Sequence, residues 1–363
     1  MTAAGELHDR HDDHGAVFEE RDGRRVVAHY GRPERTHLAV RNGAGVVTPD
    51  AGVVVVEGDD RVGYVDDVVS TAVPRAEGEG RYALLCDPQG AVETDMYVFN
   101  AGERLLLVLP ADRAGPLAAD WSEKVFIQDV TVRDASDEFA VFGVHGPTST
   151  EKVASVFSAG VPEAPLSFAR GAMHDAGVTV VASDAPTGEE GYAVVCAAAD
   201  APEVFDTLVT RGMSAPPFGR RTWETLTLEA GTPLLETELG GRLPNVCGVR
   251  NGVDLEKGCF VGQEVVSRVA NRGRPSRRLV GLLPERVPDR GAAVRDGDEV
   301  VGEVTRGAVA PSLDRPAALA LVDFDHGGDD LAVEVDGERV PAARTDLPFV
   351  EGSAASARLP RYD

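Results

Sequence analysis

The stretch RYALLCDPQGAVETDMYVFNAGERLLLVL, residues 81–109, decides the fold class. It contains three largely apolar runs with β-branched and aromatic residues, which are typical of strands. The runs are separated by Asp87-Pro88-Gln89-Gly90 and by Asn100-Ala101-Gly102-Glu103, whose proline and glycine residues suit tight turns. These residues therefore predict a meander of three strands.

The segments around this meander alternate between helical and strand patterns. Pro110 is expected to open a helix, and further helices are expected near residues 149–157, 202–212 and 221–230. Further strands are expected at residues 124–130, 139–144, 178–183 and 191–196. Because helices mix with meandering strands, the sequence favours an α+β fold over a doubly wound sheet.

The pattern changes after the Arg-Gly-Arg-Pro-Ser stretch at residues 272–276. Short strands separated by Gly, Pro and Asp are expected at residues 278–284, 299–306, 318–324 and 331–337, which is typical of a small barrel or sandwich. We therefore predict two α+β lobes over residues 21–275 and a small C-terminal β-barrel over residues 277–363.

Residues 1–20 are polar and acidic, and we predict that they form a mobile N-terminus. Their composition matches neither a signal peptide nor an Arg-rich transit peptide. His8, His11 and His14 have a spacing that could bind a metal. A solvated terminus is the simpler interpretation, so no metal site is predicted.

The chain has 363 residues and a formal net charge of −24, with 60 acidic residues against 36 Lys and Arg. A surface that binds nucleic acid needs clustered cations, so general nucleic-acid binding is not expected. Abundant Asp and Glu with only three lysines are typical of a halophilic protein, and an acidic mesophilic protein is the alternative. No run of about 18 apolar residues occurs, so no membrane span is expected.

Four cysteines lie far apart at positions 86, 196, 247 and 259, without a CxxC pair. This spacing indicates neither a disulfide framework nor a metal cluster, so reduced thiols in a cytoplasmic protein are expected. The first three cysteines lie in apolar segments and are expected to be core or strand residues.

Cys259 differs because it lies within the segment Lys257–Glu264, KGCFVGQE. The Lys257 ammonium and a helix start after Gly262 would both favour a thiolate. Cys259 is therefore either a reactive thiol or a small apolar residue in a tight turn. Motifs for phosphate loops, dinucleotide binding, nucleophile elbows and HExxH zinc sites are absent from the sequence.

Two acidic positions could belong to a binding site. Asp95 shares one strand face with Glu93 and Tyr97, and that face is either solvated or part of a cleft. The Thr-Gly-Glu-Glu-Gly loop at residues 187–191 carries two acids. These acids either cap a turn or hydrogen-bond the donor edge of an amino-pyrimidine.

Several segments resemble the glycine-cleavage T-protein superfamily, in order from about residue 80 to the C-terminus. They are GRYALLCDPQGAVETDMYVF, FAVFGVHGPTSTEKV, TGEEGY and RRTWETLTLEAGTPLLETEL. Within the superfamily, KGCFVGQE and the Arg-rich stretch after it resemble the YgfZ-type proteins, which support iron–sulfur cluster assembly or repair in a folate-dependent way. The resemblance implies a three-lobed fold in which two α+β lobes close a central folate pocket.

The resemblance also implies roles for individual residues. Asp95 matches the acid that contacts the folate nitrogen near the one-carbon unit, and Tyr82 matches an aromatic residue of the folate pocket. Glu189 matches the glutamate that reads the pterin edge, Arg221 fits the YgfZ variant of a pocket arginine, and Cys259 matches the YgfZ cysteine. We accordingly expect catalytic roles for Cys259, Asp95 and Lys257, and folate contacts from Tyr82, Asp95, Glu189 and Arg221.

Three positions depart from the T-protein pattern. Ser70-Thr71-Ala72 replaces a Thr-Asn-Asp stretch, Leu109-Pro110-Ala111 replaces Val-Asn-Ala, and Trp223 stands at the place of an arginine. The resemblance therefore implies binding of tetrahydrofolate or a one-carbon derivative, in support of iron–sulfur enzymes, with those enzymes or assembly factors as partners. A tetrahydrofolate-dependent aminomethyltransferase or demethylase is the alternative, and an adaptor that has lost folate is another.

Overall fold

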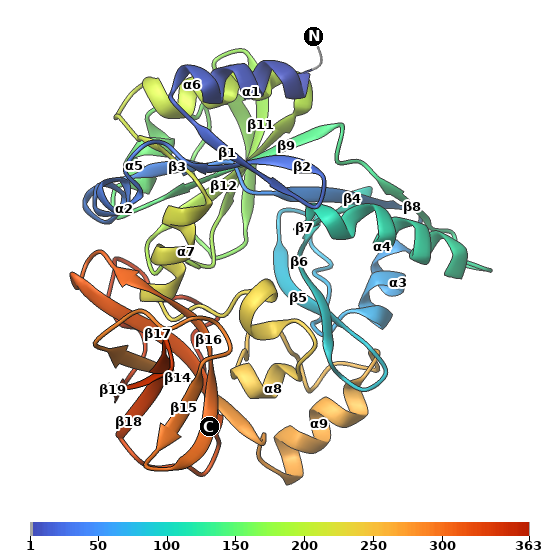
Figure 1. Cartoon of the computed structure of the whole chain (residues 1–363). Helices are drawn as coiled ribbons and strands as arrows, with labels where there is room; N and C mark the ends of the chain where they lie inside the picture. The colour runs from blue at the N-terminus through green and yellow to red at the C-terminus, as the bar shows by residue number, and fades with distance from the viewer. Residues whose placement is uncertain (1–2, 363) are drawn as a thin grey trace.

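A computed structural model describes residues 3–362 as two α+β lobes and a closed barrel (Figure 1). This arrangement confirms the predicted three-lobed fold. Within the described range, no helix is both long and apolar enough to cross a membrane.

The first lobe is a five-stranded antiparallel sheet in the order β5-β6-β7-β4-β8, covered by two helices. Its elements are β4 (Ala51–Glu57), α3 (Arg61–Val68), β5 (Gly80–Cys86), β6 (Val92–Asn100), β7 (Arg104–Pro110), α4 (Ala111–Lys124) and β8 (Thr131–Asp134). The predicted meander is confirmed as β5, β6 and β7. Val65 of α3 and Trp121 of α4 are buried in the same apolar cluster as Leu105 and Leu107 of β7.

The second lobe is a six-stranded sheet in the order β10-β11-β12-β9-β3-β13. Its strands are β3 (Gly45–Val47), β9 (Phe139–His145), β10 (Phe168–Met173), β11 (Ala176–Ala182), β12 (Gly191–Ala197) and β13 (Pro217–Phe218). Its helical elements are α1 (Ala3–Asp13), α2 (Pro33–Asn42), α5 (Ser149–Ala154), η1 (Ala198–Asp200), α6 (Ala201–Thr210) and α7 (Arg220–Glu229). Phe205 and Leu208 of α6 pack on Val180 and Val194 in its core.

The third lobe is a closed barrel in the order β14-β17-β16-β15-β18-β19. Its strands are β14 (Arg277–Pro284), β15 (Ala293–Asp296), β16 (Glu299–Ala310), β17 (Arg315–Asp323), β18 (Asp330–Val335) and β19 (Glu338–Thr345). The connection to the second lobe contains η2 (Leu235–Leu239), α8 (Pro244–Cys247) and α9 (Gln263–Arg272). Closure pairs β14 with β19 and leaves no open sheet edge.

Residues 3–20 form regular structure, which corrects the prediction of a mobile terminus for this part of residues 1–20. Helix α1 contacts α6, and residues 17–29 form a hairpin of β1 (Val17–Arg21) and β2 (Arg24–His29). His11 is buried, its Nδ1 lies 2.8 Å from the Tyr30 hydroxyl, and its ring packs edge-on against Phe205. His11 therefore anchors α1 to α6 through its contact with Phe205.

The barrel ends before the C-terminus, which corrects the predicted limits of 277–363. Strand β19 ends at Thr345, and the following residues, here called the C-terminal tail (residues 346–362), return to the α+β lobes. Backbone hydrogen bonds join Val350 to Glu229, Ala357 to Asp184 and Arg361 to Gly248. The tail therefore contacts α7, the loop before β12 and α8.

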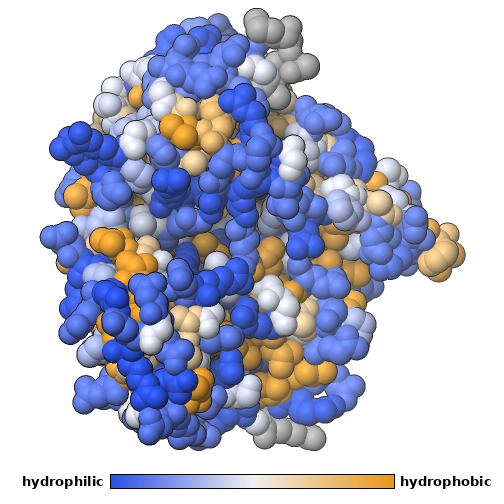
Figure 2. Space-filling view, viewed as in Figure 1, coloured by the Kyte–Doolittle hydropathy of each residue, from blue (hydrophilic) through white to orange (hydrophobic). Residues whose placement is uncertain are grey.

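The strand expected at residues 124–130 does not form, because α4 runs to Lys124 and strand pairing with β4 begins at Thr131. The intervening loop exposes 84% of Phe126 and 94% of Ile127. Figure 2 shows an apolar protrusion beyond α4 on a face that is otherwise largely hydrophilic.

Candidate functional site

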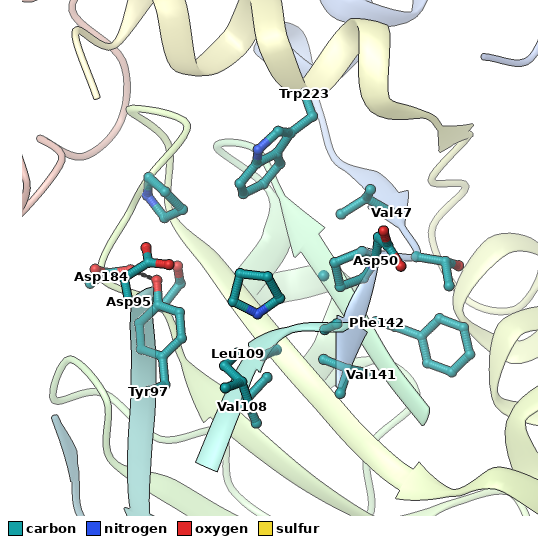
Figure 3. A pocket seen from close by; sticks show the side chains of 18 of the residues that line it. Val47, Asp50, Asp95, Tyr97, Val108, Leu109, Val141, Phe142, Asp184 and Trp223 are labelled. Carbon is teal, nitrogen blue, oxygen red and sulfur yellow. Dashed lines mark hydrogen bonds between the residues drawn. The ribbon is translucent and has the colours of Figure 1, made fainter. Parts of the chain in front are cut away.

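A cavity of about 330 Å³ is lined by strands of both α+β lobes, by the β1–β2 hairpin and by α7. Val108 and Leu109 of β7 and Val141 and Phe142 of β9 line its apolar part, and Trp223 projects toward it from α7 (Figure 3). Figure 3 also shows Asp95, Tyr97 and Asp184 gathered at one side. The cavity thus combines apolar walls with one concentrated group of polar side chains.

The polar end is built on paired strands. Tyr82 of β5 lies directly opposite Tyr97 of β6, and Asp95 is two residues before Tyr97 on the same face. The Tyr82 hydroxyl donates a hydrogen bond of 2.8 Å to Asp95 Oδ2. From the loop before β12, Asp184 accepts a 2.7 Å hydrogen bond from the Tyr97 hydroxyl at Oδ1. Two tyrosines therefore orient two carboxylates toward the same end.

Arg358 of the C-terminal tail lies between these carboxylates. Its Nε donates to Asp184 Oδ2 at 3.3 Å, and its Nη1 lies 3.7 Å from Asp95 Oδ2. Its Nη2 donates to the Tyr97 hydroxyl, and the guanidinium lies 4.3 Å from the centre of the Tyr82 ring. One buried cation is therefore shared by two aspartates and two aromatic rings.

The two tyrosines remain neutral hydrogen-bond donors. Burial raises the pKa of Tyr82 and of Tyr97 well above the usual value, and the neighbouring aspartates act in the same direction. The side chains at this end that can carry a formal charge are therefore Asp95, Asp184 and Arg358.

His145, at the end of β9, adds a neutral imidazole to the cavity wall. Burial lowers the pKa of His145 to about 4, although Asp184 acts in the opposite direction. Its Nδ1 is buried and has no hydrogen-bond partner among the described residues, and its ring packs edge-on against Trp223 at 5.4 Å. A Cβ at Gly143 would lie 2.7 Å from Nε2 and a Cβ at Gly191 would lie 2.5 Å from Nδ1, so both glycines make room for the ring.

Ion pairs line the part of the cavity that meets solvent. Arg21 Nη2 lies 2.7 Å from Glu236 Oε2, and Arg220 pairs with Glu19 and Glu224. All five side chains are partly exposed. Charged groups therefore join the β1–β2 hairpin to α7 and η2 across the entrance.

Residues 7–257 match the family described as the GCVT N-terminal domain, and residues 277–351 match the glycine cleavage T-protein C-terminal barrel domain. The chain belongs to the glycine-cleavage T-protein family. An aminomethyltransferase of Saccharopolyspora erythraea is 33% identical over 361 residues, covering 96% of this chain and 98% of the relative. An aminomethyltransferase of Streptomyces avermitilis is 34% identical over 355 residues, covering 93% of this chain and 95% of the relative.

A solved structure supports the same fold. Glycine cleavage system aminomethyltransferase T from Bartonella henselae superimposes with a TM-score of 0.85 at 23% identity, and the match covers 96% of this chain and 98% of that chain.

Within this T-protein family chain, two of the expected site residues meet. Asp95 and Tyr82 both line the cavity and are hydrogen-bonded to each other. Sequence reasoning missed Asp184, although the loop that carries it had been singled out for its later acids. No sequence pattern indicated Arg358 as a site residue, because it lies in an irregular segment beyond the barrel strands.

Glu189, from which a contact with a pterin edge was expected, lies outside the wall of this cavity. It is buried but does not line the cavity. Its Oε1 accepts a 2.8 Å hydrogen bond from Arg41, and its Oε2 accepts bonds of 2.8 and 2.6 Å from the backbone and hydroxyl of Ser353. Both oxygens therefore serve the contact between α2 and the C-terminal tail.

Arg221 is also displaced from the site. It is exposed at the second position of α7, whereas its neighbour Arg220 lines the cavity. Adjacent helix positions point about 100° apart, so a shift of one residue moves a side chain off the cavity wall. Arg220 and not Arg221, from which a folate contact was expected, therefore lies on the cavity wall.

Lys257 is bound to the end of α3. Its Nζ donates hydrogen bonds to the carbonyls of Asp66, Val69 and Thr71. The distance is 2.8 Å to the Val69 oxygen and 3.3 Å to the Thr71 oxygen. Burial lowers the pKa of Lys257, while Asp66 opposes this effect. The ammonium therefore satisfies carbonyls at a helix C-terminus and does not line the cavity.

Cys259 is exposed, and it is not among the residues that line the cavity. The thiol expected at or beside the folate pocket is therefore not part of the wall of this cavity. Burial raises the pKa of Cys86, Cys196 and Cys247 to about 12, which agrees with their expected core positions. Cys259 is therefore the exposed thiol among the four cysteines.

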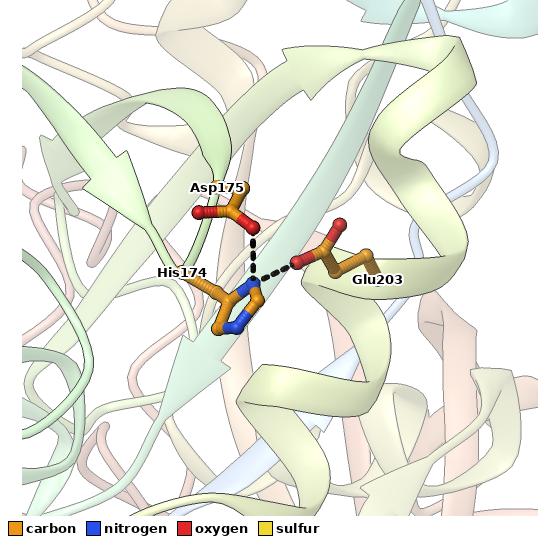
Figure 4. A group of neighbouring side chains, drawn as sticks. All are labelled: His174, Asp175 and Glu203. Carbon is orange, nitrogen blue, oxygen red and sulfur yellow. Dashed lines mark hydrogen bonds and ion pairs between the residues drawn. The ribbon is translucent and has the colours of Figure 1, made fainter.

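One surface group has the residue types of a metal site. The His174 imidazole faces Asp175 and Glu203, with Nδ1 3.3 Å from Asp175 Oδ2 (Figure 4). All three side chains are exposed, so an ordinary ion pair at the β10–β11 turn accounts for the arrangement.

Proposed function

We propose that the central cavity binds a reduced folate and that the chain transfers a one-carbon unit from an amine donor to tetrahydrofolate. The observation that carries the proposal is the state of Asp95. Its Oδ2 accepts a hydrogen bond of 2.8 Å from the Tyr82 hydroxyl, and the residue lines the cavity, so a ligand there would meet an oriented carboxylate. Membership of a family whose similar relatives are named aminomethyltransferase supports this chemistry over reactions without folate.

The cavity fits the ring system of a folate in size and in chemistry. Its volume of about 330 Å³ lies within the usual range for ligand pockets, roughly 300–1,000 Å³. Its apolar walls suit flat rings, and its aspartates are acceptors for the N–H groups of an amino-pyrimidine. Glu189 was expected to make that contact, and we assign it to Asp184 because Asp184 lines the cavity.

Bound tetrahydrofolate would supply a nitrogen that bonds to the one-carbon unit while the bond between that carbon and the donor's amine nitrogen breaks, so the amine leaves with the electron pair. The Asp95 carboxylate would accept the proton that the folate nitrogen loses and would pass a proton to the departing amine. The Tyr82 hydroxyl holds Oδ2 and thereby orients the carboxylate for this role. Trp223 and Phe142 line the apolar part of the cavity and would exclude water from bound rings there.

Replacement of Asp95 by Asn tests the proposal. We expect formation of methylenetetrahydrofolate from an amine or lipoyl-bound aminomethyl donor to fall by a factor of about 10² or more, because a general base typically contributes roughly 10²–10⁴. Glu93→Gln is the matched control, since Glu93 lies two residues away on β6 and is exposed. Absence of turnover by the parent chain, or undiminished turnover by Asp95→Asn, would contradict the assignment.

A second function rests on Cys259. The KGCFVGQE segment resembles YgfZ-type proteins, and Cys259 is its exposed thiol. The Ser70 and Thr71 side chains, at positions that depart from the T-protein pattern, donate to the carbonyls of Gly252 and Tyr82. These hydroxyls are thereby engaged by backbone carbonyls, and neither supplies the acid of the T-protein pattern.

A complementation experiment separates this second function from the first. In a deletion strain, Cys259→Ser should impair iron–sulfur enzymes while leaving folate-dependent transfer in vitro unchanged. Cys247→Ser is the control, because Cys247 is buried. Full recovery of the iron–sulfur enzymes by the Cys259→Ser chain would refute the role of this thiol.

A further inference from the structure

The C-terminal tail (residues 346–362) is attached to the cavity as well as to the barrel. Ser353 binds Glu189, Ala357 N–H donates to the Asp184 carbonyl at 3.0 Å, and the Tyr362 hydroxyl donates to the Val246 carbonyl at 2.9 Å. These contacts lie on both sides of Arg358 in the sequence. They hold the backbone so that the Arg358 side chain enters the polar end of the cavity.

Arg358 is the cation that serves the polar end of the cavity. Its side chain is 7% exposed, and its nitrogens reach Asp184, Asp95 and the Tyr97 hydroxyl. Two other arginines line the cavity, but Arg21 pairs with Glu236, and Arg220 pairs with acids at the entrance. The charge at the polar end therefore depends on a residue beyond position 351, where the family match ends.

We propose that Arg358 is a positioning and specificity-determining residue of the folate cavity, a role that rests on the proposed function. Two aspartates and one arginine leave one negative charge at this end, since Tyr82, Tyr97 and His145 are neutral. Such an end accepts neutral N–H donors or a group with one positive charge, and it disfavours an anion. The guanidinium also fixes both carboxylates through one planar fork.

Loss of the guanidinium has two physical consequences. Asp95 and Asp184 would face each other without a cation, and closely spaced carboxylates retain a proton to higher pH than an isolated one. The retained proton would remove an acceptor from the ligand. A lysine would restore the charge but not the planar set of N–H donors that contacts both carboxylates, because its ammonium is a point charge.

The test measures binding of 5-formyltetrahydrofolate by calorimetry from about pH 5 to about pH 9 in molar potassium chloride. Arg358→Met should weaken binding at neutral pH by roughly tenfold or more. It should also raise, by about one pH unit, the pH below which affinity falls, here called the acid limb of the affinity–pH profile. Arg358→Lys should retain the position of the acid limb with reduced affinity. Arg361→Met, an exposed arginine of the same tail, should match the parent chain.

A charge-rescue variant separates this role from simple support of the fold. Asp184→Asn in the Arg358→Met background leaves one negative charge at the polar end and should return the acid limb toward the parent position. A parent-like profile for Arg358→Met, or failure of the double variant to move the limb, would overturn the proposal. If Arg358→Met does not fold, Arg358→Lys and Arg358→Lys with Asp184→Asn decide the same question, because the latter should move the limb downward.

A ligand-free measurement keeps the two proposals distinguishable. The unfolding free energy lost in Arg358→Met should be larger near pH 8 than near pH 5, because a guanidinium stabilises carboxylates only when they are ionised. If the parent chain binds no 5-formyltetrahydrofolate, folate binding fails while this measurement still tests the charge role. A loss that does not change with pH would overturn the role of Arg358 itself.

Discussion

Lys257 shows that a charged side chain within a sequence motif can have a structural role, because its ammonium donates to backbone carbonyls. Its ammonium donates to three carbonyls in and after the last turn of α3 and lies 3.7 Å from Asp66 Oδ2. The side chain is 3% exposed, so removing the ammonium would leave carbonyls at the α3 end without their donor. The lysine of the motif therefore ties the segment to the first lobe.

We predict that Lys257→Met lowers the free energy of unfolding by about 2 kcal/mol or more, because hydrogen bonds to a charged group contribute about 1.5–3 kcal/mol each. Lys124→Met is the control. Its ammonium forms an exposed pair with Asp120 on α4, and such pairs contribute about 0.3–0.5 kcal/mol. Denaturant unfolding of both variants measures the difference, and equal losses would rule out the helix-end role.

Asp184 and Glu189 show how finely a binding role depends on position within one loop. Both acids are buried, and both are hydrogen-bonded by an arginine and by a hydroxyl. Asp184 lines the cavity, whereas Glu189, five residues later, faces α2 and the tail. The turn between them includes Ala185 and Gly188 at positive φ, which redirects the chain.

At the scale of elements, the pairing of β9 with β12 determines the shape of the cavity wall. His145 lies opposite Gly191 in this pair, and Gly143 is two residues away on the same face. Any larger residue at either glycine would occupy the space of the imidazole. The strands thus place a large ring on a surface that glycine keeps flat.

We predict that Gly191→Ala lowers the free energy of unfolding by about 1–3 kcal/mol, which is the usual effect of overpacking. The new Cβ would lie 2.5 Å from His145 Nδ1 and 2.9 Å from the Val144 carbonyl. Gly177→Ala in β11 is the matched control, because no atom lies within 4 Å of its Cβ position. Denaturant unfolding decides, and equal stability of the two variants would show that the imidazole has room to move.

The KGCFVGQE segment is also positioned by an element contact. Gly262 precedes α9 at a φ of 81°, and a Cβ there would lie 2.5 Å from the Asp87 carbonyl and 2.7 Å from Gly90 Cα. Glycine is therefore required both for the left-handed backbone and for packing against the β5–β6 turn. This contact fixes the start of α9 against the meander.

At the scale of the whole molecule, a buried polar network joins the second lobe, the barrel and the tail. His37 and Arg41 of α2 contact Glu229 of α7, and Arg41 also donates to Glu189. Glu229 accepts hydrogen bonds from Ser312 of the barrel, and Glu189 accepts one from the backbone N–H of Ser353 in the tail. Buried groups with paired charges fix the relative positions of these parts, because separating them would leave charges unpaired.

The net charge of −24 leads to a prediction about salt. Self-repulsion of a highly charged surface destabilises the compact state, and salt screens it. We expect the melting temperature to rise as potassium chloride increases from about 0.1 M, where the Debye length is about 10 Å, to about 1 M, where it is about 3 Å. Differential scanning calorimetry measures this change, and a constant melting temperature would contradict salt adaptation.

The sequence by itself determined the features that depend on neighbours in the chain. Alternation and turn residues predict the meander and the barrel strands, and strand pairing joins Tyr82 to Asp95 across only 13 residues. The core positions of three cysteines follow from apolar segments in the same way. Local periodicity is sufficient here because it sets which side chains share a face.

Only the tertiary structure decided how the polar end of the cavity is completed. Tyr97 meets Asp184 across 87 residues and Arg358 across 261, and Lys257 reaches Asp66 across 191. These contacts depend on how the lobes pack and where the tail returns, and no local pattern encodes either. The segment around Cys259, which had the clearest sequence motif, is bound to the first lobe and does not line the cavity. Arg358 of the tail, which no motif indicated, supplies the positive charge at the polar end of the cavity.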